Sequence, residues 1–434
     1  MRFPGEVTAE KALVRLMPNG VRDESFYNSG LGMGKLMQWN TSSFYVGTSQ
    51  IVRRILMNGT QDPAFIEMNS GPYFSSLQGG DYYVYPDGRV LMGGRHGLSD
   101  SIRGFMGDHC LIWFSNTGYL DTTQHHRQCS GALYRFQELP DGKFIGSGST
   151  STWDGQPASN IFRFHADGAL DTAFQANVWT GLAYGFLPLP DGRVYAAGNF
   201  RITGNPDTLQ LVRFLPDGSL DPSFNTQLEF GTIELTGFEG GAILRSVYQL
   251  DAGRLVVMGH FELVEGQARR HICLIDTAGN LIDDHFTGPG CGNNPPNPVG
   301  WISGSAAGMV QAPDGSYYIY GSYHGYGDAS VTDTLQRQVS RLHGFNVGAQ
   351  EQEPGHEIMR VWPNPASGIV HVEVRGPMKD AGLVLRDAMG RMIRRQRITT
   401  TRSIVELSGL SPGLYLLILQ QGGRNIAATK LLLE

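Results

Sequence analysis

The segment Leu-Val-Arg-Phe-Leu-Pro-Asp-Gly-Ser-Leu-Asp-Pro-Ser-Phe, residues 211–224, decides the fold because its pattern recurs along the chain. The pattern is an apolar strand with an arginine, a turn that ends in glycine, a second aspartate and a closing phenylalanine. Degenerate copies follow Ile112 and Ile272. Such internal repetition is typical of repeat architectures. The clear copies place these four residues at Arg15, Gly20, Asp23 and Phe26; at Arg54, Gly59, Asp62 and Phe65; at Arg163, Gly168, Asp171 and Phe174; and at Arg213, Gly218, Asp221 and Phe224.

A second element, Pro-Asp-Gly followed by alternating apolar residues, lies between these copies. It occurs at residues 86–88, 140–142, 190–192 and 313–315, with a weakened form at 251–253. Proline, aspartate and glycine between two alternating runs are typical of a hairpin turn. Each repeat therefore predicts two hairpins, or four antiparallel strands.

A four-stranded sheet cannot bury both of its faces alone, so neighbouring repeats must stack. Four strands in roughly 50 residues is close to the size of one β-propeller blade. The sequence therefore predicts an all-β propeller over residues 1–347 with six blades, and seven blades is the alternative. The predicted blades are 36–65, 78–124, 133–174, 183–225, 244–286 and 307–345.

The beginning of the chain lies inside a repeat, since residues 13–26 have no Pro-Asp-Gly hairpin before them. We expect residues 21–26 to form the outer strand of the last blade, because ring closure removes exposed sheet edges. A truncated seventh blade remains the alternative. Residues 1–6 lack the apolar core of a signal peptide. We therefore expect the true start to lie upstream of Met1.

The C-terminal part of the chain differs in pattern. Residues 348–358 are polar and predict a linker. Residues 359–434 predict a small antiparallel β-sandwich. Its expected strands are 370–374, 383–385, 404–407, 414–419 and 429–433.

Two family resemblances follow from these motifs. Residues 11–345 resemble the delta-60 repeat, which forms propellers in secreted bacterial proteins and has no common activity. Residues 359–434 resemble a type A C-terminal sorting domain of the type IX secretion system, although Trp362 stands where that family usually has tyrosine. The landmarks of this second resemblance are Trp362, Pro363, Asn364, Pro365, Gly390, Pro412, Gly413 and Lys430.

The second resemblance implies a destination. It implies transit through the periplasm, passage across the outer membrane, and release or attachment at the cell surface. The type IX translocon and its sorting machinery are then the expected partners. The resemblance also implies that the sorting domain is usually removed, and an immunoglobulin-like adhesive module is the alternative interpretation of this domain.

Composition excludes several other classes. A formal net charge of -6 and 58 glycines without a three-residue period argue against nucleic-acid binding and against collagen. No apolar run is long enough for a transmembrane helix. We expect a monomer.

The four cysteines allow three disulfide connectivities. We predict the pairs Cys110–Cys129 and Cys273–Cys291, because each pair flanks the arginine-type hairpin of its own repeat. Histidines beside the first pair do not have the spacing of a standard zinc motif. We therefore expect no metal and no cofactor.

No catalytic motif is present in the sequence, so we predict no enzyme and no catalytic residue. The first hypothesis is a binding or scaffolding propeller for a glycan or protein ligand, which uses its long loops, 95–108 and 287–300. The alternative is an extracellular polysaccharide hydrolase or lyase. A third interpretation is a spacer for a further domain. The alternative would need acid and base residues on the channel face, such as Arg95, His96, Asp100, Arg103 and Asp108.

Overall fold

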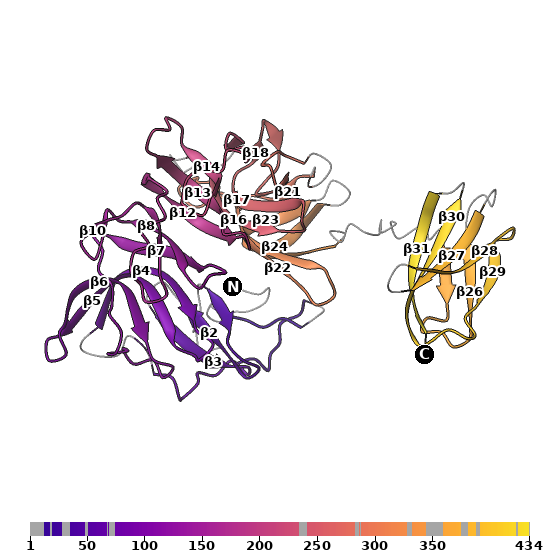
Figure 1. Ribbon diagram of the computed structural model, residues 1–434, viewed down its shortest axis with the longest axis horizontal. Helices are drawn as coiled ribbons and strands as arrows, with labels where there is room; N and C mark the ends of the chain where they lie inside the picture. The colour runs from indigo at the N-terminus through magenta and orange to yellow at the C-terminus, as the bar shows by residue number, and fades with distance from the viewer. Residues whose placement is uncertain are drawn as a thin grey trace. The chain divides into compact units, whose positions relative to one another are not determined.

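The structure is a computed structural model that divides into two compact units (Figure 1). Unit 1 comprises residues 1–312 and 317–341, and unit 2 comprises residues 313–316 and 342–434. The predicted linker, 348–358, lies outside the described residues, so the domain boundaries stay a prediction. The described residues are 13–17, 20–27, 35–47, 51–66, 68, 74–233, 241–282, 286, 288–327, 332–343, 359–374, 381–387, 391–421 and 424–433.

Unit 1 is built from antiparallel sheets, and within the described residues it contains strands but no helix. This confirms the all-β propeller class, while the number of blades stays a prediction. In the described ranges, six meanders each cover one predicted blade. They are β1 (Leu36–Gln38), β2 (Ser43–Gly47), β3 (Val52–Leu56); β4 (Phe74–Val84), β5 (Val90–Asp100), β6 (Phe105–Phe114); β7 (Ala132–Glu138), β8 (Phe144–Ser149), β11 (Ile161–Phe164); β12 (Val178–Pro188), β13 (Val194–Ile202), β14 (Leu209–Phe214); β16 (Ile243–Gln249), β17 (Arg254–His260), β20 (Ile272–Asp276); and β22 (Ser305–Gln311), β23 (Tyr317–Gly327), β24 (Thr332–Leu342).

Short strands add to these meanders. β9 (Thr152–Trp153) pairs with β10 (Gln156–Pro157), and β15 (Phe230–Gly231) pairs with β18 (Leu263–Val264). β18 also pairs with β19 (Gln267–Ala268). β21 (Gly290–Cys291) joins the edge of β23.

In the clear copies of the motif, the fourth strand that the sequence predicts is reduced to a single β-bridge. In the cleanest copy Phe214 pairs with Leu220, and nothing further of that segment joins the sheet. The cause is Asp221, whose side chain accepts the backbone N–H of Ser223 and turns the chain immediately. The chain then places Phe224 in the core instead of extending along β14.

The repeated arginine links each sheet to the next. Arg213 Nε donates to Asp221 Oδ2 at 2.7 Å, and its guanidinium carbon lies 5.2 Å from the Phe224 ring centroid. Its Nη1 then donates to the backbone oxygen of Thr277, two residues before the turn glycine of the following sheet. We call this arrangement the arginine clasp.

The arginine clasp recurs in all four clear copies of the motif. In every copy Nη1 reaches the carbonyl two residues before the next glycine of the motif, at 2.6–2.7 Å. The repeated charges therefore serve the contact between sheets. The donor and acceptor residues are Arg15 and Met57, Arg54 and Asn116, Arg163 and Pro216, and Arg213 and Thr277.

The first strands of consecutive sheets pack against one another, which places them toward the middle of unit 1. β4 contacts β7, β7 contacts β12, β12 contacts β16, and β16 contacts β22. Gly185 on β12 permits one of these approaches, because a Cβ there would collide with the Arg245 carbonyl on β16. Behind these strands the sheets bury apolar side chains such as Leu244, Val257 and Phe214.

The segment of residues 13–27 lies against the first meander. The backbone N–H of Tyr27 donates to the Asn58 oxygen at 2.8 Å, and the Phe26 ring stacks on Phe44. These contacts tie the first copy of the motif to the second. The predicted closure of the ring by residues 21–26 stays a prediction.

Unit 2 is a sandwich of a three-stranded and a four-stranded antiparallel sheet. Leucine, valine and alanine side chains from both sheets fill its core. The five strands that the sequence predicts are present, and two more, β25 and β28, join them. The sheets are β25 (Met359–Trp362), β26 (Ile369–Val374) and β29 (Arg402–Glu406), and β28 (Met392–Arg397), β27 (Ala381–Asp387), β30 (Gly413–Gln421) and β31 (Arg424–Leu433).

The sequence landmarks of unit 2 hold its two ends together. Asn364 Nδ2 donates to the Lys430 oxygen at 2.7 Å, and its Oδ1 accepts the N–H of Leu432 at 2.9 Å. The side chain thus completes the edge of β31 as a neighbouring strand would. Gly413 opens β30 opposite Leu433. Gly390 lies outside the described residues.

Candidate ligand-binding site

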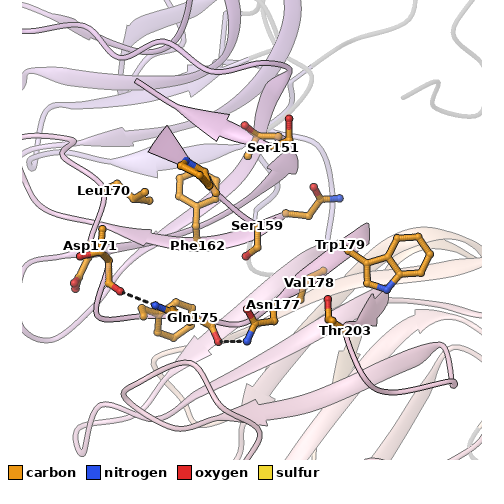
Figure 2. A pocket seen from close by; sticks show the side chains of 16 residues that line it. Ser151, Ser159, Phe162, Leu170, Asp171, Gln175, Asn177, Val178, Trp179 and Thr203 are labelled. Atoms are coloured by element: carbon orange, nitrogen blue, oxygen red, sulfur yellow. Dashed lines mark hydrogen bonds between the residues drawn. The ribbon is translucent and has the colours of Figure 1, made fainter. Parts of the chain in front are cut away.

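A cavity of about 520 Å³ opens beside the start of β12. Its walls come from the loop after β8, from the motif copy at residues 162–175, and from β12 with the end of β13 (Figure 2). This volume lies in the usual range of small-ligand sites, about 300–1,000 Å³. The side chains that supply its polar surface are Ser151, Ser159, Asn160, Asp171, Thr172, Gln175, Asn177 and Thr203.

Trp179 at this cavity lies in a β-bulge. Val178 pairs with Ile202 and Thr180 pairs with Arg201, which leaves Trp179 as the extra residue of β12. A bulge of this kind redirects a side chain away from the ordinary alternation. The indole is 59% exposed and lies at the edge of the lining that Figure 2 draws.

The polar lining is mostly neutral and is held in place by local hydrogen bonds. Asn177 Nδ2 donates to the backbone oxygen of Gln175, and Gln175 Nε2 donates to the backbone oxygen of Thr172, each at 3.3 Å (Figure 2). Asn177 has a φ of 54° and its carbonyl accepts the Thr203 N–H. Within the part of the chain that the structure describes, the side-chain amide oxygens of Gln175 and Asn177 have no hydrogen-bond partner, so both are available as acceptors.

Asp171 is the one carboxylate among the residues that line this cavity. Burial alone would raise its pKa, but hydrogen bonds from Lys143 and Arg163 outweigh burial and lower the pKa to about 2. The group therefore stays ionised and paired. Glycoside hydrolysis with two carboxylates needs a proton-carrying acid beside a second carboxylate, and this cavity offers neither.

The residues named for the hydrolase alternative do not line this cavity. Arg95 and Asp108 form an exposed ion pair at 2.6 Å on the long β5–β6 hairpin. Asp100 is buried and pairs with Arg103. His96 is buried under Phe74, its Nε2 meets the Gly93 oxygen, and burial lowers its pKa to about 4.

The first predicted disulfide is present, since Cys110 and Cys129 are joined. The second is not formed, because Cys273 and Cys291 are free and buried. The reason is register: Cys273 pairs opposite Val257 inside the β16–β17–β20 sheet, whereas Cys291 pairs opposite Tyr326 in the next sheet.

The histidines beside the disulfide are packed rather than assembled as ligands. The His109 and His126 rings are 6.2 Å apart, and burial lowers the pKa of both. Among the described residues, no group of three or more His, Cys, Asp or Glu side chains could hold a metal ion. In the same residues no helix has the length and hydrophobicity to cross a membrane.

Comparison with known families now places both parts of the chain. Residues 139–174 and 189–224 match a β-propeller family described as a domain of unknown function, DUF5122. Residues 360–434 match the secretion system C-terminal sorting domain. No curated protein matches the chain.

Solved structures with some likeness to this chain include two bacterial proteins. PorZ, a surface component of the type IX secretion system of Porphyromonas gingivalis, is 12% identical with a TM-score of 0.38; the match covers 92% of this chain and 59% of that one. A protein of Bacteroides fragilis is 11% identical with a TM-score of 0.35, over 62% of this chain and 73% of that one. This chain therefore spans less than two thirds of the PorZ length.

The fold and the sorting tail together define a class, the exported bacterial β-propellers. This chain combines repeats of the DUF5122 type with a type IX secretion sorting domain, as the resemblances implied. It is therefore exported to the cell surface or the extracellular space.

The sequence did not point to Trp179. It is not part of the repeat, and it lies outside the loops 95–108 and 287–300 that the first hypothesis favoured. The one hint in the sequence is a tryptophan between Val178 and Thr180, at a position that strand alternation places on the solvent face. The bulge that moves it to the cavity has no marker in the sequence.

Proposed function

We propose that this exported propeller binds a neutral saccharide in the cavity beside β12. One observation carries the proposal: the exposed indole of Trp179, at a bulge, borders a cavity whose polar side chains are, apart from Asp171, neutral hydroxyls and amides. A sugar ring presents an apolar C–H face and a rim of hydroxyls. An indole is a large, rigid partner for the first, and amide oxygens accept hydrogen bonds from the second.

The expected test compares two exposed tryptophans of the propeller. Trp179 is 59% exposed and Trp301, which follows the loop 287–300, is 53% exposed. A panel of neutral oligosaccharides is titrated against the full chain by calorimetry. Trp179→Ala should weaken binding at least tenfold, about 1.4 kcal/mol. Trp301→Ala should change it less than twofold.

Either of two results would end this proposal. One is that no neutral oligosaccharide on the panel binds. The other is that Trp301→Ala removes binding while Trp179→Ala does not, which would place the site at the loop 287–300. A reducing-end assay on the same sugars addresses the hydrolase alternative, and we expect no release of reducing ends.

We also propose that the type IX machinery recognises the edge that Asn364 forms with β31. The side chain makes two hydrogen bonds to the last strand, so Asn364→Ala should loosen that edge without touching the core. In a host with this secretion system the variant should accumulate in the periplasm. Its secretion at the wild-type level would contradict the proposal. We propose that the chain is a monomer, and light scattering of the full 434-residue chain, with 47.5 kDa expected, tests this.

A further inference from the structure

A second cavity, of about 480 Å³, lies where the first strands of the sheets meet. It is lined by residues of β4, β7, β12 and β16, by the last residues of β2 and β8, and by Lys35, just before β1. It therefore occupies the middle of unit 1 rather than the face of any one sheet. Its size again suits a small ligand or the end group of a longer one.

The β-bulges of three consecutive sheets supply the side chains of this cavity. The pairing register shifts between Leu133 and Arg135, between Ala183 and Gly185, and between Leu244 and Ser246. The bulged residues are thus Tyr134 on β7, Tyr184 on β12 and Arg245 on β16, and all three line the cavity. Bulges at corresponding positions re-aim side chains that would otherwise alternate with the strand.

The charges in this cavity do not balance. Lys35 Nζ lies 3.2 Å from Asp81 Oδ1, so these two groups neutralise each other. Arg245 and Arg135 also line the cavity, and within the described residues neither has a carboxylate partner. Two positive charges are therefore left over in the middle of the propeller.

Arg245 is held in a position that disfavours its charge. Desolvation lowers its pKa, and the positive charge of Arg135 lowers it further, while Tyr184 acts in the opposite direction. The guanidinium carbon lies 5.2 Å from the Tyr184 ring centroid, so the side chain is fixed by a cation–π contact. A half-buried cation beside a second cation is costly unless an anion completes the site.

We propose that this central cavity binds a carboxylate-bearing saccharide, with Arg245 and Arg135 holding the carboxylate. A guanidinium pairs with a carboxylate through two parallel hydrogen bonds, which a compact ammonium cannot do. Tyr134, Tyr184 and Ser149 line the same cavity, and their hydroxyl groups suit the hydroxyls of a sugar. This site is separate from the cavity at Trp179, so each can fail without the other.

The test uses one sugar with and without its charge. Trigalacturonic acid and its fully methyl-esterified form are titrated against the full chain by calorimetry at low and high salt. The wild type should bind the acid at least tenfold more tightly than the ester. Added salt should weaken the binding of the acid and leave the binding of the ester unchanged. Arg245→Gln should lower affinity for the acid at least tenfold, and Arg135→Gln, at an exposed position, should lower it severalfold.

The matched control is Arg201→Gln, an exposed arginine of β13 outside this cavity, which should change affinity less than twofold. Equal binding of acid and ester would overturn the proposal, as would unchanged binding in both Arg245→Gln and Arg135→Gln. Displacement of the acid by equimolar sodium acetate would also overturn it, because the cavity would then select an anion and not a saccharide. If Arg245→Gln does not fold, the affinity of Arg135→Gln for the acid decides the test.

Discussion

The β12–β14 and β4–β6 sheets contact their following neighbours with different residues at the same place. In the first, Arg213 pairs with Asp221 and donates to the Thr277 oxygen of the next sheet. In the second, Trp113 stands where the arginine would be, and no phenylalanine follows Asp121 at the usual distance. The arginine clasp is therefore missing from that sheet.

Another arginine performs the contact in the β4–β6 sheet. Arg127 Nε and Nη2 both donate to the Asp167 oxygen, beside the turn glycine of the next sheet. Asp154 holds the same guanidinium at 3.0 Å. The disulfide lies next to this segment, since the N–H of Cys110 donates to the Arg127 oxygen and Cys129 follows two residues later.

The comparison shows which contact the two sheets share. In both, a backbone oxygen just before the turn glycine accepts hydrogen bonds from an arginine of the preceding sheet. An arginine inside the strand supplies the donor in four copies. A disulfide-anchored arginine supplies it in the fifth.

The largest expected effect comes from breaking a buried arginine clasp. Arg213→Ala leaves Asp221, whose side chain is 6% exposed, without its main partner, and should cost about 3–5 kcal/mol. Arg15→Ala should cost less, about 1 kcal/mol, because its ion pair is 39% exposed on the arginine side. Urea denaturation of both variants tests the order, and an equal loss would show that burial does not decide the effect.

The disulfide should make the next largest contribution to the free energy of unfolding. Replacing Cys110 and Cys129 with serine should cost about 3 kcal/mol, since the bond closes a loop with a sequence separation of 19. Alkylation of the denatured chain without reductant should modify two thiols, those of Cys273 and Cys291. Four modified thiols, or none, would contradict the pairing described above.

Acid should weaken the arginine clasp of the third meander. The pKa of Asp171 is about 2 in the folded chain, below its ordinary value of 3.8. A lowered pKa stabilises the fold above the unfolded value, and that stability is lost as the pH falls through the folded pKa. About 2 kcal/mol should therefore disappear between pH 4 and pH 2. Thermal melts of the wild type and of Asp171→Asn test this, because the variant should lose less stability over that range.

Removing Arg127, the donor of the β4–β6 sheet, should lower the free energy of unfolding moderately. Arg127→Met leaves the Asp167 oxygen without two side-chain hydrogen bonds and should cost about 1–2 kcal/mol. Because the disulfide positions Arg127, the combined loss with Cys110→Ser and Cys129→Ser should be smaller than the sum of the separate losses. Strict additivity in chemical denaturation would argue that the disulfide and Arg127 act independently.

The smallest effect is expected on the surface of the β5–β6 hairpin. Arg95 and Asp108 are 48% and 38% exposed, so Arg95→Ala should change the unfolding free energy by less than about 1 kcal/mol. Added salt should reduce even this difference. A loss comparable to that of Arg213→Ala would contradict the distinction between exposed pairs and the arginine clasp.

The sequence predicts the parts of this molecule that repeat. Arg163, Gly168, Asp171 and Phe174 recur in register, so the strands and turns around them could be foreseen. The absence of the fourth strand could not be predicted from the sequence. An aspartate such as Asp171 is compatible both with the start of a strand and with a turn that ends it.

The candidate sites depend on features that occur once. Trp179, Tyr184 and Arg245 reach their cavities through β-bulges, and a bulge shifts a side chain without changing composition or spacing. The second disulfide was mispredicted for a related reason. Relative to the repeat, Cys273 lies two residues further along its strand than Cys110, which places it opposite Val257 in the core.

The motif arginine stabilises the turn of the next sheet, and hydrogen exchange measures this effect at individual amides. In Arg213→Ala the amides of Asp276 and Gly279, which close the turn of the following sheet, should exchange faster than in the wild type. Faster exchange confined to residues 211–224, with the turn at 276–279 unchanged, would contradict the account.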